Sequence, residues 1–211
     1  MNDLSIRICT IRAAEGGARL LIEVVVEEQG EARRELLAIL SARLERLPRV
    51  GPIDEEQYEV LKHEAAISDA IAAGLRALGA NGSSRRHLCE KLCMRGIRRE
   101  VAAIAVEELA EKGYLKEEEG ALREAEKGLA KLWGDRRILA DLSAKGYGGG
   151  ALKYAAARLR SEDGAARCAQ LISKRRMPIP TDAKEAQKLF AALTRYGYSA
   201  GEIRHAMEKL S

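Results

Sequence analysis

One pattern constrains the fold of this 211-residue chain more than any other: a glycine that follows an apolar stripe recurs at a nearly constant interval. Gly96, Gly146 and Gly197 are 50 and 51 residues apart. Each has an apolar residue eight positions before it, a leucine four before it and a large apolar or aromatic residue directly after it. The three sets are Leu88, Leu92 and Ile97; Ile138, Leu142 and Tyr147; and Leu189, Leu193 and Tyr198. A single glycine commonly ends a helix, but three in the same register indicate a repeat.

Each repeat is predicted to contain three helices, because a further helical segment precedes each glycine unit. These segments are residues 55–79, 117–133 and 161–175. A unit of this size cannot bury its apolar stripe alone, so neighbouring units must stack. The sequence therefore predicts a mainly α fold in which tandem three-helix repeats form an elongated, curved array. The expected division is an N-terminal part over 1–52 and repeats over 53–115, 116–160 and 161–211.

The N-terminal part has a different pattern from the rest of the chain. Two β-rich runs, LSIRICTIR and RLLIEVVVEE, flank a glycine-containing turn and predict a hairpin. The segment after it, residues 31–46, carries leucines at helical spacing and is predicted to be a helix that supports the hairpin. Pro48 and the Gly51–Pro52 pair are then expected to break the chain.

Several polar residues mark expected helix boundaries. Ser84, Ser161 and Ser199 each precede a helix as candidate N-caps, and Glu202 completes a capping box with Ser199. The glycines at 148–150 replace such a cap in the middle repeat, so that helix should begin loosely. The third repeat contains an insertion, RRMPIPTD, whose prolines predict a stiff extended connection.

Composition and motifs narrow the function classes. The N-terminus has no signal-peptide pattern and no apolar run reaches the roughly 20 residues of a membrane span, so we expect a cytoplasmic protein that binds no membrane. The four cysteines have no disulfide-framework spacing and are expected to be free thiols. We find no catalytic motif, and the sequence predicts a non-enzymatic protein with no small-molecule substrate, cofactor or metal. His87, Cys89 and Cys93 resemble a metal cluster but lack a fourth ligand.

Basic residues are concentrated in the C-terminal two-thirds of the chain. Residues 1–82 carry a formal charge of −4 and residues 83–211 carry +8. Each basic residue alone is ordinary surface charge, but their recurrence around the repeat corners predicts a line of cations suited to a nucleic-acid backbone or an acidic groove. The first choices for this surface are Arg136, Arg137 and Lys145, and the others are Arg85, Arg86, Arg98, Arg99, Arg158, Lys174, Arg175 and Arg176. Tyr147 and Tyr198 occupy the corner position of Ile97, which favours packing over base stacking.

The repeat motifs resemble those of the RecX regulatory proteins, which modulate the RecA recombinase. GDRRILADLSAKG over 134–146 is similar to the family pattern G-x-x-R-I-x-x-E-L-x-x-K-G, with Asp141 in place of Glu. SRRHLCEKLCMRG (84–96), LAEKGYL (109–115) and LTRYGYSAGEI (193–203) resemble further family segments, so the similarity covers about 55–211. Departures occur at Lys116–Glu117, where the family has Asp-Asp, at Gly120, where it has Phe, and at Arg86–His87, where an acidic residue is usual.

The resemblance implies a monomeric protein that lies along the groove of the RecA–single-stranded-DNA filament. Such a regulator limits the recombinase and co-protease activities of RecA in homologous recombination, DNA repair and the SOS response, and contacts the DNA directly or through the filament. An alternative from another class is a stand-alone DNA-binding protein whose helix–corner–helix pieces act as helix-turn-helix motifs. The helix after the middle corner, GGGALKYAAAR, offers few side chains that could bind base edges.

Overall fold

A computed structural model describes residues 4–78 and 83–209. The chain divides into two compact units, residues 1–77 with 88–114 and residues 78–87 with 115–211, and the division falls inside helix α2. The N-terminal strands are β1 (Leu4–Ala14), β2 (Arg19–Glu28), β3 (Glu31–Leu40) and β4 (Gly51–Ile53), with short 3-10 helices at Glu15–Gly17 and Ser41–Arg43. The helices of the first repeat are α1 (Glu55–Leu78), α2 (Arg85–Met94) and α3 (Arg99–Glu111). Those of the second are α4 (Glu117–Ala130), α5 (Asp135–Ala144) and α6 (Gly149–Arg160). Those of the third are α7 (Gly164–Lys174), α8 (Ala183–Arg195) and α9 (Ala200–Glu208).

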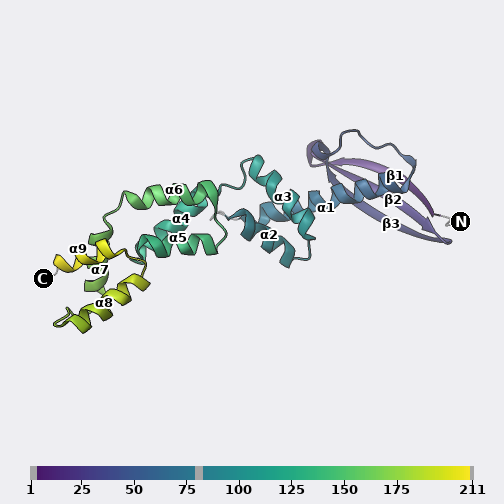
Figure 1. Ribbon diagram of the computed structural model, residues 1–211. Helices are drawn as coiled ribbons and strands as arrows, with labels where there is room; N and C mark the ends of the chain where they lie inside the picture. Colours follow the sequence, from purple (N-terminus) through teal and green to yellow (C-terminus); the bar gives the residue numbers. More distant parts are fainter. Residues whose placement is uncertain (1–3, 79–82, 210–211) are drawn as a thin grey trace. The chain divides into compact units, whose positions relative to one another are not determined.

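The first unit contains a four-stranded antiparallel sheet in the order β3-β2-β1-β4 (Figure 1). Strand residues alternate between its two faces. The inner face carries Ile8, Ile22, Val24 and Ile39, all fully buried against the first half of α1. Thus a hydrophobic core forms between one side of the sheet and a single helix.

The predicted helix over 31–46 is wrong, because residues 31–40 form strand β3. Gln29 and Gly30 both have positive φ, 53° and 86°, and connect β2 to β3 as a two-residue hairpin turn. The leucine spacing fits a helix equally well, but pairing with β2 buries Leu37 and Ile39 on the core face. Two strands alone are marginal in water, so a third strand stabilises the sheet where a helix was expected to do so.

The three glycine corners are equivalent, as the repeat predicts. Gly96, Gly146 and Gly197 have φ of 86°, 84° and 94°, a conformation that favours glycine. In each corner the glycine N–H donates to the carbonyl three residues before it, at 2.9 Å. The following residue donates to the carbonyl five before it, at 3.1–3.3 Å. This pair of bonds is the Schellman ending of a helix.

Packing inside the second unit follows the predicted stripes. Ile138 and Leu142 of α5 are buried, and the small side chains of Ala121 and Ala125 of α4 are buried with them. Helices α4 and α5 lie side by side (Figure 1). Tyr147 and Tyr198 pack in the cores, which confirms their assignment to packing. The elongation of the whole array stays a prediction.

Two of the three predicted caps are present, and one is wrong. The Ser84 hydroxyl accepts the His87 N–H at 3.1 Å, and Ser199 forms a capping box with Glu202. Asp163, not Ser161, caps α7, because its carboxylate accepts the Ala166 N–H at 2.9 Å. As the glycine run predicts, no side chain caps α6.

Candidate polyanion-binding interface

The second unit contains two junctions in which the start of one helix contacts a later glycine corner. At the first, the Ser84 hydroxyl donates to the Lys145 carbonyl at 2.7 Å and the Arg86 guanidinium donates to the Ala144 carbonyl at 2.6 Å. These carbonyls belong to the last turn of α5, which lacks intrahelical donors. The beginning of α2 therefore supplies hydrogen-bond donors to carbonyl groups at the end of α5.

The second junction repeats this arrangement one repeat later. The Gly134 N–H donates to the Tyr196 carbonyl at 2.8 Å, and the Arg136 N–H donates to the Gly197 carbonyl at 3.2 Å. Gly134 and Ser84 both lie twelve residues before the corner glycine of their own repeat. A β-carbon on Gly134 would lie 2.3 Å from the Gly197 carbonyl carbon, so the two backbones are in direct contact.

These junctions and nearby carboxylates engage several of the predicted cations. The Lys145 ammonium lies 2.6 Å from a Glu124 carboxylate oxygen and 2.7 Å from one of Asp141. Although burial alone would lower the pKa of Lys145, hydrogen bonds to Asp141 and Glu124 raise it above its usual value. Arg158 pairs with Glu126 at 2.9 Å, and the Arg85 N–H donates to Glu117 at 2.8 Å. Binding an external anion at these residues would compete with existing ion pairs.

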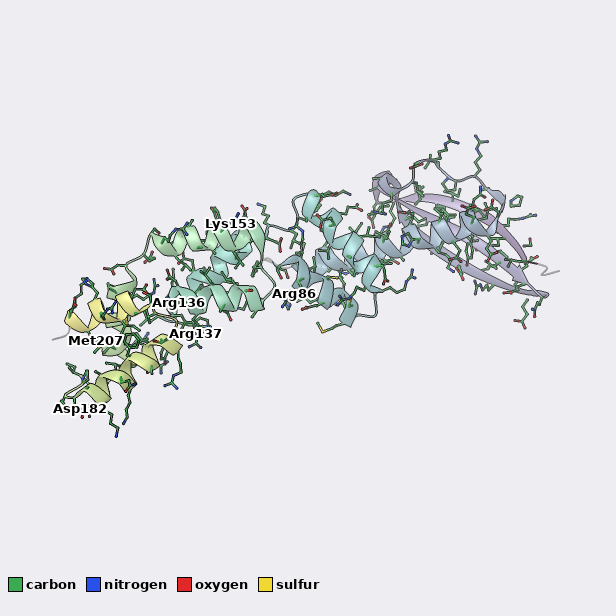
Figure 2. The ribbon with its side chains drawn as sticks, in the orientation of Figure 1. Arg86, Arg136, Arg137, Lys153, Asp182 and Met207 are labelled. Atoms are coloured by element: carbon green, nitrogen blue, oxygen red, sulfur yellow. The ribbon has the colours of Figure 1, made fainter. Side chains whose placement is uncertain are left out.

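Arg137 takes part in a cluster of cations and aromatic rings that we call the cation–aromatic cluster: Lys131, Trp133, Arg137 and Tyr196. The Arg137 guanidinium carbon lies 4.2 Å from the centre of the Trp133 ring and 5.6 Å from that of Tyr196. The Lys131 ammonium lies 4.7 Å from the Trp133 ring centre. Figure 2 labels Arg136 and Arg137 where α5 begins, next to the C-terminal helices of the same unit.

A cavity of about 330 Å³ adjoins the cluster, where α4 and α7 end. Its lining residues are Ala130, Lys131, Leu132, Trp133, Leu171, Lys174 and Arg175. Three of these carry positive charge and none is acidic. The cations also complement the negative C-terminal ends of α4 and α7. With an indole beside them, they form a site suited to a phosphodiester or carboxylate, with an apolar surface for the rest of the ligand.

The remaining predicted residues lie in different places. Arg136 and Arg176 are exposed, whereas Arg98 and Arg99 lie at the start of α3 in the first unit. Sequence reasoning missed Lys131 and Trp133, because neither occupies a repeated position. The one signal available was that Trp133 is the single tryptophan of the chain.

Together these features define the class: a tandem three-helix-repeat protein preceded by a small antiparallel sheet, with helix starts docked on glycine corners. Two solved structures are similar to this chain in fold. A crystal structure of regulatory protein RecX superposes with a TM-score of 0.74 at 19% identity, over 96% of this chain and 99% of that one. RecX from Lactobacillus salivarius gives a TM-score of 0.58 at 19% identity, over 69% of this chain and 96% of that one.

The chain thus has the fold of the RecX regulatory proteins, and the resemblance seen in its motifs is confirmed at the level of the fold. No protein-family model and no curated protein sequence matches it. Across residues 4–78 and 83–209, no helix combines the length and apolar character needed to cross a membrane.

Proposed function

We propose that this chain is a RecX-like regulator that binds the RecA–single-stranded-DNA filament and limits its recombinase and co-protease activities, with no enzymatic activity of its own. The observation that carries the proposal is the shared fold with a RecX regulatory protein over 96% of the chain. The corner motifs at 84–96, 134–146 and 193–203 support it independently of the superposition.

Within this proposal, the filament-facing surface is the cation–aromatic cluster with Arg136, Lys174, Arg175 and Arg176. Three of its cations, Lys131, Lys174 and Arg175, line a cavity without acidic side chains. Lys145 and Arg158, by contrast, are held by internal carboxylates. A phosphate backbone gains most from cations whose counterions are released on binding, because that release drives association. Cations already paired inside the protein release few counterions and contribute less.

The first experiment is a titration of the protein into RecA assembling on single-stranded DNA, with ATP turnover and filament length as readouts. We expect both to fall as the protein is added. Unchanged assembly and turnover at saturating protein would contradict the proposed function. Selective retention of one duplex sequence without RecA would favour the helix-turn-helix alternative.

A matched pair of variants tests the assigned surface. Lys174→Ala with Arg175→Ala removes two cavity cations, and we expect weaker filament binding with a salt dependence reduced by about 0.7 in slope for each lost phosphate contact. Lys184→Ala with Lys188→Ala removes the same charge from exposed positions of α8 and is the control. Equal effects of the two pairs would show that the cavity is not the binding surface.

The single tryptophan gives a direct readout of the cluster. Because Trp133 lies beside the cavity, binding of single-stranded oligothymidylate there should change its fluorescence. The Lys174→Ala, Arg175→Ala variant should lose most of this change. A filament-binding protein whose Trp133 emission never responds to DNA would engage the filament through protein contacts or another surface.

A further inference from the structure

The outer face of the N-terminal sheet, opposite the face that packs on α1, has a composition that the proposed function does not use. Its residues follow from the strand register and form three central cross-strand rows, each running from β1 through β2 to β3. The rows are Arg7, Val25 and Arg34; Thr10, Glu23 and Leu36; and Arg12, Leu21 and Ala38. A fourth row, at the end near Gly17, contains Ala14, Arg19 and Leu40. The central strand β2 thus places Val25 and Leu21 on either side of Glu23, and Leu36 lies beside Glu23 on β3. Arg7 and Arg12 line the β1 side of this aliphatic group, and Arg34 lies at one end of its β3 side.

This face is accessible in the described part of the chain. Leu36 is 62% exposed, and Arg7, Arg12 and Arg34 are exposed as well. By contrast, Ile8, Val24 and Ile39 on the opposite face are fully buried beneath α1. An antiparallel sheet can leave one face to solvent, but such a face normally alternates to polar residues. Leu21, Val25 and Leu36 depart from that rule, which marks a surface that gains free energy when covered.

The positive charge that is available on this face lies on the β1 side, because no ion pair among the described residues engages Arg7 or Arg12. Glu23 is already engaged, since one carboxylate oxygen accepts the Thr10 hydroxyl at 3.2 Å and the other lies 3.5 Å from the Arg34 guanidinium. Glu27 lies one row beyond Arg7, toward the Gln29–Gly30 turn. Every basic residue in the first 61 positions is arginine. Arginine binds carboxylates with two parallel hydrogen bonds and is enriched at protein interfaces.

The absence of aromatic residues distinguishes between two kinds of anionic partner. Proteins that bind single-stranded nucleic acid on a sheet stack the bases on aromatic side chains. The first 57 residues contain no Phe, Tyr, Trp or His. On this face, the aliphatic side chains would instead lie against sugar and phosphate groups, with which they form few favourable contacts. The same side chains suit an apolar ridge of a protein, and the flanking arginines suit carboxylates beside that ridge.

We propose that the outer face of the sheet is a docking surface for a protein partner that presents an apolar ridge flanked by acidic side chains. Leu21, Val25 and Leu36 cover the ridge, and Arg7 and Arg12 on the β1 side bind the carboxylates beside it, whereas Arg34 is already paired with Glu23. This surface lies on the sheet and shares no residue with the cation–aromatic cluster.

The test uses the full chain and a fluorescein-labelled helical peptide of about 18 residues, with leucines at every third or fourth position and glutamates on both sides of the leucine stripe. We expect the peptide to bind and to shift the methyl NMR signals of Leu21, Val25 and Leu36. Arg7→Glu with Arg12→Glu should raise the dissociation constant by about tenfold or more, because it reverses one flank. Leu36→Ser should also weaken binding, and its 62% exposure predicts an unchanged fold.

Two controls and two competitors decide the outcome. Arg49→Glu reverses an exposed charge in the loop between β3 and β4, beside the α1 side of the sheet, and should leave binding unchanged. A peptide with lysine in place of glutamate should not bind; equal binding would overturn the proposal. Oligothymidylate that shifts the same methyl signals and displaces the acidic peptide would make this a nucleic-acid surface instead. Self-association that Leu36→Ser abolishes would make it an interface between copies. Since the probe contains neither RecA nor DNA, its failure would leave the proposed function untouched.

Discussion

Replacing Gly134 with alanine isolates the energy of the junction between the second and third repeats. Gly134 has φ −75° and ψ 157°, which alanine adopts without strain, so the backbone dihedral angles do not oppose the substitution. Its new β-carbon, however, would lie 2.3 Å from the Gly197 carbonyl carbon and 2.4 Å from the Tyr198 nitrogen. Both are backbone atoms and cannot rotate away, so the two segments must separate.

The expected cost follows from the contacts that this separation breaks. The Gly134 and Arg136 N–H groups lose their bonds to the Tyr196 and Gly197 carbonyls. Each net hydrogen bond contributes about 0.5–1.5 kcal/mol, and forced overpacking costs about 1–3 kcal/mol, so the free energy of unfolding should fall by about 2–6 kcal/mol. In a chain of this size a loss near the middle of that range lowers the melting temperature by on the order of 10 °C.

Gly201→Ala is the matched control. Apart from its chain neighbours and the backbone of its own helix, no atom of the described residues lies within 4 Å of the position of its β-carbon, and Gly201 sits inside α9. Alanine should leave stability unchanged or raise it by up to about 1 kcal/mol. Thermal and urea unfolding measure both variants, and hydrogen exchange should show lost protection at the Gly134 and Arg136 amides. If Gly134→Ala unfolds within about 1 kcal/mol of the unmodified chain, the direct backbone contact at this junction does not exist in solution.

Two further predictions use the pKa shifts. Burial opposes ionisation of Glu124, but hydrogen bonds from Lys127 and Lys145 lower its pKa below the usual 4.5. The ionised carboxylate therefore stabilises the folded protein above pH 4.5, and this stabilisation is lost as the pH falls through the pKa of the folded state. Glu124→Gln should therefore destabilise the protein in urea unfolding at neutral pH, and the gap in unfolding free energy should shrink as the pH is lowered below 4.5. A gap that stays constant as the pH falls would contradict the assignment. Burial raises the pKa of Cys168 to about 11, so this thiol should react slowly with a disulfide reagent at neutral pH while the three partly exposed cysteines react faster. Cys168→Ser should leave the fast phase unchanged, and a fast phase reduced by one thiol would show that Cys168 is accessible.

The repeat and its corners could be predicted from the sequence because they depend on local interactions. A glycine at Gly96, Gly146 or Gly197 allows a positive φ within its own turn, and the apolar residues four and eight positions earlier fix which face of the helix is buried. These effects act over a few residues, so the residue pattern is sufficient to predict them. The hairpin of β1 and β2 followed from the same kind of signal.

The third strand could not be separated from a helix by the same reasoning. Leucines at 36, 37, 40 and 44 fit both structures, and the decision came from pairing with β2 and burial against α1. The Gln29–Gly30 turn was the local signal that favoured the strand. Tertiary burial overrides helix propensity, which amounts to less than about 1 kcal/mol per residue.

The candidate site likewise depends in part on local sequence and in part on tertiary structure. Sequence determined that arginines and lysines recur around the corners, but it ranked Lys145 among the first choices and placed Lys174 and Arg175 behind it. Only the tertiary structure decided which cations meet carboxylates and which line a cavity with Trp133. The physical reason is distance along the chain: Arg137 and Tyr196 are far apart in sequence, and their contact depends on how one repeat packs on the next. The hydrophobic periodicity of the sequence determines which face of each helix is buried. The partners of a charged side chain on the surface depend instead on which helix packs beside it.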